Sequence, residues 1–185
     1  MKTGWIDLLC RAFGLQRADT PPDRDGGGPR RVLLMRHAEK TGDPDDIHLS
    51  DAGMMRARRL ARYIPDNFGK PDFIFAAARS KHSIRSIETV QPLANALGLE
   101  VQDDIEDKDF EELVSELFSN SEYLAKTILI CWHHGKLPEI AALLGAPDRS
   151  YPDPWPENVF NVIIDLGYGV DSSRPPTAAQ VIEPF

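Results

Sequence analysis

Basic and imidazole side chains gather directly after three apolar stretches of the sequence. The stretches cover residues 32–35, 73–77 and 127–132. The residues that follow them are Arg36 and His37 after the first, Arg79, Lys81, His82 and Arg85 after the second, and His133 and His134 after the third. Because arginine, lysine and histidine donate hydrogen bonds to anions, these residue types favour binding of, or chemistry on, a phosphate or carboxylate group.

The apolar stretches are short and compact, which is typical of buried strands, and helical periodicity separates them. We expect a helix that begins at Asp51 and is ended by Pro65 and the NFGKP stretch over 67–71. Further helices are expected over 84–97, 110–118 and 137–144, with a short strand near 99–101 and a last strand over 159–166. Alternating strands and helices predict a three-layer α/β/α sandwich with a mostly parallel central sheet. The carboxyl ends of parallel strands meet at one edge, so the basic residues are expected to share a site there.

Composition limits the possible partners. The chain has 185 residues, 42% of them hydrophobic, and 21 Lys and Arg against 29 Asp and Glu give a net charge of −8. An acidic chain of this kind is not expected to bind nucleic acid or anionic membranes, since both require clustered positive charge. No apolar run approaches the roughly 20 residues of a membrane span. Two cysteines, Cys10 and Cys131, make no disulfide framework, so we expect a reducing, cytoplasmic location.

The amino-terminal part differs in composition from the rest. Residues 18–29 are rich in Pro, Gly and Asp and offer no apolar anchor, which is typical of a linker. We therefore predict a tail and linker over 1–29 and a single folded domain over 30–185.

Several phosphate chemistries can be excluded from the motifs. The sequence has no GxxxxGK[ST] loop, so it lacks a P-loop. A cysteine phosphatase needs Arg six residues after its Cys, whereas Leu137 follows Cys131 at that distance. His133 and His134 are adjacent at a strand end and tend to point to opposite faces, so they are not expected to chelate one metal ion.

The ordered motifs resemble those of the histidine phosphatase superfamily, which includes the phosphoglycerate mutases. The matches are Arg36-His37-Ala38-Glu39-Lys40 to the Arg-His-Gly signature, Leu49–Gly53 to L-[ST]-x-x-G, Arg85–Thr89 to R-A-x-Q-T, His134-Gly135 to the second His-Gly pair, and, more weakly, Ile105–Phe110 to L-x-E-x-x-[FG]. Each triplet alone is weak, but the set occurs in order from residue 30 to about 166.

The resemblance implies a role for each matching residue. His37 would be the nucleophile and would become a phosphohistidine, while Arg36, Arg85 and His134 would hold the phosphoryl oxygens. A carboxyl group would protonate the leaving alcohol, and the match favours Asp107, with Glu106 and Asp104 as substitutes. Neither a metal nor another cofactor is implied. Further substrate contacts are expected from Arg79, Lys81, His133 and Lys40.

Two departures from the family pattern bear on the reaction. Ala38 replaces the glycine of the signature, and Asp43 stands six residues beyond His37, where mutases carry Asn. Acidic residues there would repel a second anionic group on a substrate, which disfavours a mutase. The sequence therefore predicts a phosphomonoester phosphatase acting on a phosphorylated small molecule or phosphoprotein. The alternatives are a weak or inactive phosphate-binding member and, third, a phosphoglycerate mutase-type phosphotransferase.

Overall fold

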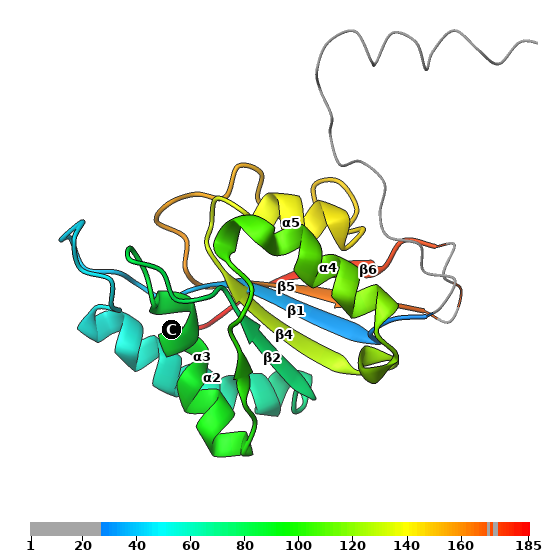
Figure 1. The fold of residues 1–185 in the computed structure, drawn as a ribbon, viewed down its shortest axis with the longest axis horizontal. Helices are drawn as coiled ribbons and strands as arrows, with labels where there is room; N and C mark the ends of the chain where they lie inside the picture. The colour runs from blue at the N-terminus through cyan, green and yellow to red at the C-terminus, as the bar shows by residue number, and fades with distance from the viewer. Residues whose placement is uncertain (1–26, 170, 172–173) are drawn as a thin grey trace, which may run out of the picture.

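The computed structural model describes residues 27–169, 171 and 174–185, and six strands within these residues form one sheet in the order β3-β2-β4-β1-β5-β6 (Figure 1). The strands are β1 (Arg31–Arg36), β2 (Phe73–Ala76), β3 (Val101–Gln102), β4 (Thr127–Trp132), β5 (Val162–Gly167) and β6 (Thr177–Ile182). The helices are α2 (Asp51–Phe68), α3 (Arg85–Leu97), α4 (Phe110–Ser119) and α5 (Leu137–Leu143), with 3-10 turns η1 (Asp107–Asp109) and η2 (Ser121–Tyr123).

The sheet is mixed but mostly parallel. β1 pairs in parallel with β4, and β2 pairs in parallel with both β3 and β4. β5 runs antiparallel to β1, and β6 runs antiparallel to β5. The carboxyl ends of β1, β2 and β4 therefore lie at one edge, which confirms the fold class expected from the sequence.

Helices cover both faces of the sheet, and the alternation of side chains along each strand sorts the core into two layers (Figure 1). On one face, Leu33 and Met35 of β1 pack in a cluster with Leu60 of α2. On the other face, Leu34 packs in a cluster with Leu113 of α4. Because β1 and β4 are buried on both faces, their sequences are continuous apolar runs. The bounds of both strands agree with the predicted ranges to within one residue at each end.

The last part of the chain departs from the predicted elements, whereas the helix that begins at Asp51 ends where it was expected. It ends at Phe68, within the stretch 67–71, with Pro65 in its last turn, and Gly69 at φ 83° provides the stop. The last strand was placed over 159–166, but β5 is followed by β6. β6 was missed because its sequence, TAAQVI, has no apolar run, as suits an edge strand with exposed side chains.

The predicted tail over 1–29 lies almost wholly outside the described residues. Within the part of the chain that the structure describes, none of the helices has both the length and the apolar character that crossing a bilayer requires.

Candidate active site

His37 follows β1 and lies at the edge where the parallel strands end. Its backbone N–H donates to Trp132 O at the end of β4 over 3.1 Å, which extends the pairing of the two strands by one residue. The residue is only 2% exposed. Nδ1 lies 2.7 Å from Ala38 O. Since a carbonyl oxygen only accepts, Nδ1 must carry the ring proton, and Nε2 keeps a free lone pair.

The surroundings of His37 keep its ring neutral. Burial is the main cause that lowers its pKa, and the nearby His133, Arg36 and Arg85 lower it further, to about 3, although the bond to Ala38 raises it. The ring of His133 stands edge-on to that of His37, with ring centroids 5.2 Å apart. A neutral imidazole with a free lone pair is what a histidine nucleophile requires.

This neutral histidine predicts a loss of stability in acid. In the unfolded chain an imidazole takes up a proton below about pH 6.5, whereas folded His37 does so only near its pKa of about 3. The unfolded state therefore binds more protons between these values, so the free energy of unfolding falls as the pH drops through this window. We expect the melting temperature of His37→Gln to fall less between pH 7 and pH 4 than that of the wild type. Equal losses would contradict a buried, neutral His37.

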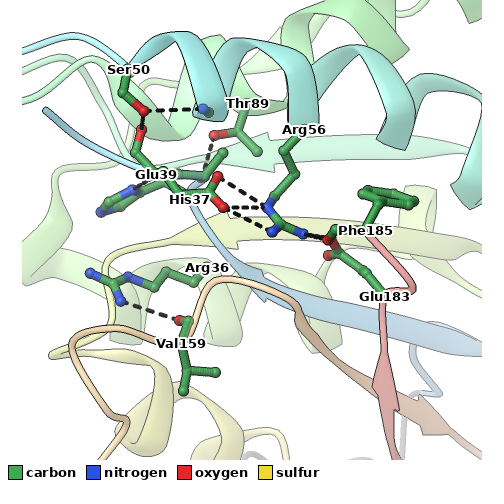
Figure 2. Close-up of polar contacts among 11 residues, drawn as sticks. Arg36, His37, Glu39, Ser50, Arg56, Thr89, Val159, Glu183 and Phe185 are labelled. Carbon is green, nitrogen blue, oxygen red and sulfur yellow. Dashed lines mark hydrogen bonds and ion pairs between the residues drawn. The ribbon is translucent and has the colours of Figure 1, made fainter.

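Arg36 is held by backbone carbonyls of the loop before β5. Its Nη1 donates to the oxygen of Val159 at 3.2 Å (Figure 2) and to those of Pro156 at 3.3 Å and Glu157 at 2.6 Å. Its guanidinium carbon lies 3.9 Å from the centroid of the Phe160 ring. Burial lowers its pKa to about 10, and Arg85 contributes to the shift while Glu157 opposes it. Arg36 therefore stays positive at neutral pH.

Arg85 begins α3 and reaches the loop before α2. Its Nη1 donates to Asp46 O over 2.8 Å, and its Nη2 donates to His82 O over 3.3 Å. Burial lowers its pKa, while Asp46 and Glu88 oppose the shift. The Nε atoms of Arg36 and Arg85 are buried, and neither has a hydrogen-bond partner among the described residues. These two donors are available for an anionic ligand.

The two histidines after β4 join the same cluster. Burial lowers the pKa of His133 to about 4, with Arg85, His134 and Arg36 adding to the shift. The pKa of His134 is also lowered, mainly by burial and then by Arg36 and Lys40, while Glu157 raises it. The structure therefore brings His37, Arg36, Arg85, His133 and His134 together, as the sequence predicted, with exposed Lys40 close enough to affect His134.

Two of the expected substrate contacts make no hydrogen bond or ion pair with this cluster among the described residues. Arg79 and Lys81 are exposed on the loop after β2. Arg79 directly precedes, and Lys81 lies within, the turn in which Ser80 Oγ accepts from the N–H groups of His82 and Ser83.

Of the three acid candidates, Asp107 has the surroundings of a proton donor. Burial raises its pKa, and Glu139 adds to the shift while Lys136 and Trp132 oppose it. Its Oδ1 is buried without a hydrogen-bond partner in the described part of the chain, and its backbone oxygen accepts from Trp132 Nε1 over 3.2 Å. Glu106 is exposed and pairs with Lys108, and Asp104 is exposed as well.

Sequence reasoning missed the groups that position the nucleophile. Thr89 Oγ1 accepts from the Ala38 N–H over 2.9 Å (Figure 2) and donates to Arg85 O over 2.7 Å, so it links the segments of His37 and Arg85. Thr89 ends the matched R-A-x-Q-T segment, so its position in the motif was a usable signal. The carbonyls that hold Arg36 carried no such signal, because a backbone oxygen is the same in every residue.

Among the described residues, no group of three or more His, Cys, Asp or Glu side chains is arranged to hold a metal ion.

Several solved structures share this fold. One is the protein histidine phosphatase SixA complexed with tungstate, with a TM-score of 0.63 and 16% identity over 82% of this chain and 96% of that chain. Another is the putative phosphohistidine phosphatase SixA from Agrobacterium tumefaciens, with a TM-score of 0.54 and 20% identity over 83% and 96%. A third is a putative alpha-ribazole-5'-P phosphatase from Escherichia coli, with a TM-score of 0.55 and 14% identity over 83% and 96%.

Because these structures are only 14–20% identical to the chain, their likeness shows a shared fold and nothing more. The match of the sequence to a family model is a separate finding. None of the curated proteins matches the chain. The model of the histidine phosphatase superfamily (branch 1) matches residues 32–115, a span that includes Arg36, His37 and Arg85. Together with the shared fold and the strand-end cluster of arginine and histidine, this match supports the resemblance to the histidine phosphatase superfamily that the sequence motifs indicate.

Proposed function

We propose that the protein hydrolyses phosphomonoesters through a phosphohistidine formed on His37. The observation that carries this proposal is the bond between His37 Nδ1 and Ala38 O, which leaves a neutral Nε2 lone pair near the buried guanidinium group of Arg36 and the half-buried one of Arg85. In the first step, Nε2 attacks phosphorus, a phosphorus–nitrogen bond forms and the bond to the ester oxygen breaks. In the second step, water attacks the phosphohistidine and releases inorganic phosphate, returning the lone pair to Nε2.

The positive groups stabilise the charge that the transferring phosphoryl group carries. The unpartnered Nε donors of Arg36 and Arg85, with His134, would hold its three equatorial oxygens. Donors already aimed at a developing charge, in a site that excludes water, supply the main stabilisation in phosphoryl transfer. The same arrangement would bind free phosphate, and it concentrates positive charge locally in a chain whose net charge is −8.

Asp107 would act as the acid for the leaving oxygen and then as the base for water. Its half-buried position raises its pKa above the ordinary value of an aspartate, which favours the protonated form that an acid needs. This placement favours an active phosphatase over the alternative of a phosphate-binding protein without catalysis.

The loop after β1 favours hydrolysis over mutase activity. Asp43 and Asp45 are exposed there, and Asp43 Oδ1 accepts from the Asp45 N–H over 2.9 Å. Asp46 in the same loop presents its backbone oxygen to Arg85. A loop rich in carboxylates beside the phosphate site would repel the second anionic group that a phosphoglycerate carries.

The direct test is hydrolysis of p-nitrophenyl phosphate in the presence of EDTA. The proposal predicts steady release of p-nitrophenol that the chelator does not change. It also predicts competitive inhibition by inorganic phosphate and by tungstate. Turnover that disappears with EDTA and returns with a divalent cation would contradict the metal-independent mechanism. Tight phosphate binding without turnover of any ester would support the binding-only alternative.

The role of Asp107 makes a prediction that depends on the leaving group. Nitrophenol leaves readily without a proton, whereas an alkyl alcohol needs one, so Asp107→Asn should slow alkyl phosphate hydrolysis about 10²- to 10³-fold. The loss with p-nitrophenyl phosphate should be less than about tenfold. The check is kcat/KM for both substrates, with Glu106→Gln as the matched control on the neighbouring exposed carboxylate. Equal losses on the two substrates would place the acid elsewhere.

A further inference from the structure

Arg56, in the second turn of α2, connects the nucleophile segment to the carboxyl-terminal end of the described chain. Its Nε lies 3.0 and 3.1 Å from the two carboxylate oxygens of Glu39, and its Nη2 lies 2.8 Å from one of them. Its Nη1 donates to Glu183 Oε2 over 2.5 Å and to Phe185 O over 2.6 Å (Figure 2). One guanidinium thus joins two segments 144 residues apart, from Glu39 to Glu183.

Glu39 is placed to transmit this contact to His37. The Ala38–Glu39 peptide contains the carbonyl that accepts from His37 Nδ1. Burial raises the pKa of Glu39, but the bonds from Arg56 and from the N–H of Glu39 itself lower it by more. The net shift of the pKa is therefore downward, and the carboxylate is charged. The Glu39 side chain therefore holds the same peptide group that orients the nucleophile.

The backbone of Glu39 is clamped from the α2 side as well. Glu39 O accepts from Ser50 N over 2.9 Å and from Ser50 Oγ over 3.2 Å. At Gly53 the helix approaches so closely that a Cβ would lie 2.3 Å from Glu39 O. The first turn of α2 and the segment after β1 are therefore in direct backbone contact, and Arg56 extends from the next turn over the same residue.

Glu183 is the buried anchor of this arrangement. Its side chain is 0% exposed, and its N–H donates to Asn161 O over 2.8 Å. Burial raises its pKa to about 7, with Arg56 opposing and Glu39 adding to the shift. Its Oε1 is buried with no hydrogen-bond partner among the described residues. Burying a carboxyl group this deeply lowers the stability of the fold, and pairing with Arg56 need not restore it. The pair is therefore expected to serve a purpose other than stability.

We propose that Arg56 is a positioning residue for phosphoryl transfer, which braces Glu39 against buried Glu183 and thereby fixes the Ala38 carbonyl that orients His37. This inference rests on the proposed function, since it assigns Arg56 to the reaction of His37. Arg56 itself does not touch the phosphate in this account. It keeps the Nε2 lone pair of His37 aimed at the phosphorus atom, and misaiming a nucleophile by a fraction of an ångström slows the reaction without weakening substrate binding.

The test must separate positioning from folding. Arg56→Met alone leaves Glu183 buried without its partner, so it is expected to destabilise the fold. The double variant Arg56→Met/Glu183→Gln leaves no unpaired buried charge at that place, so its melting temperature should return close to the wild-type value. Arg58→Met, an exposed arginine two residues along α2, is the matched control.

We expect the double variant to lose kcat for p-nitrophenyl phosphate by about 10- to 100-fold. Its KM and its inhibition constant for inorganic phosphate should stay within about twofold of the wild type, because Arg36, Arg85 and His134 remain. Arg56→Lys should also lose kcat, since one ammonium group cannot reach Glu39 and Glu183 together. A double variant with wild-type kcat, or one that loses phosphate affinity in proportion to kcat, would overturn the proposal.

A second readout needs no substrate. In proton–nitrogen spectra of the histidine rings, wild-type His37 should show a single tautomer with the proton on Nδ1, and the double variant should show a mixture. If the wild type hydrolyses no ester but the tautomer still changes in the double variant, the proposed function fails and the positioning role stands. Unchanged His37 signals in the double variant overturn the positioning role, whatever the activity.

Discussion

His37→Ala is expected to lower the turnover of p-nitrophenyl phosphate by on the order of 10⁴-fold or more, down to the background rate. The variant lacks the only atom that the mechanism assigns to attack on phosphorus, the Nε2 of the neutral buried imidazole. The loss should appear in kcat, because the groups that hold the phosphoryl oxygens remain. Steady-state kinetics with both proteins at high concentration measures this factor.

Two controls make this result specific. His48→Ala removes an exposed imidazole that pairs with Glu88, and we expect its kcat to stay within about twofold of the wild type. Phosphate should still raise the melting temperature of His37→Ala, since a ligand that binds only the folded state stabilises it. Retained turnover in His37→Ala, with the fold intact, would remove the basis of the assignment.

Arg85→Ala should reduce kcat/KM by about 10²- to 10³-fold, which is the effect of removing one preorganised donor from a developing negative charge. Arg85 suits this test better than Arg36, because Arg36 also holds three backbone carbonyls and its removal would disturb the loop before β5. Arg85 makes two bonds to backbone oxygens and keeps its buried Nε without a partner among the described residues.

The control for this prediction is Arg62→Ala, which removes an exposed arginine from α2. It should leave kcat/KM within about twofold of the wild type. Arg85→Lys should recover part of the loss, since it restores the charge but not the paired donors of a guanidinium. A change of less than about threefold in Arg85→Ala would show that this arginine serves the loop around Asp46 and not the phosphate.

The parallel part of the fold could be predicted because its signals are local. β1 and β4 are apolar without interruption, and the α4 pattern repeats every three to four residues. β6 could not be predicted in the same way. It lies at the sheet edge, exposes many of its side chains and pairs antiparallel with β5, so nothing in TAAQVI demands burial. Its position becomes evident only once β5 is in place.

The candidate site follows a similar division. His37, Arg36, Arg85 and the two histidines after β4 could be predicted because strand ends and motif order bring them to one edge. The contacts that position them could not. Arg36 is held by main-chain oxygens about 120 residues away, which have no side-chain signature. Arg56 pairs with Glu183 across 127 residues, and each alone has the appearance of an ordinary surface charge.

The most direct test of the central claim is to detect the phosphohistidine itself. Wild-type protein mixed with a phosphate ester, quenched with base within the first turnovers and digested at alkaline pH should yield a peptide whose added phosphate is on His37. The phosphate should be stable in base and lost in acid, as a phosphorus–nitrogen bond requires, and the wild type should hydrolyse the ester. A phosphate on another residue, or full turnover with no phosphorylated His37 at any quench time, would contradict the account.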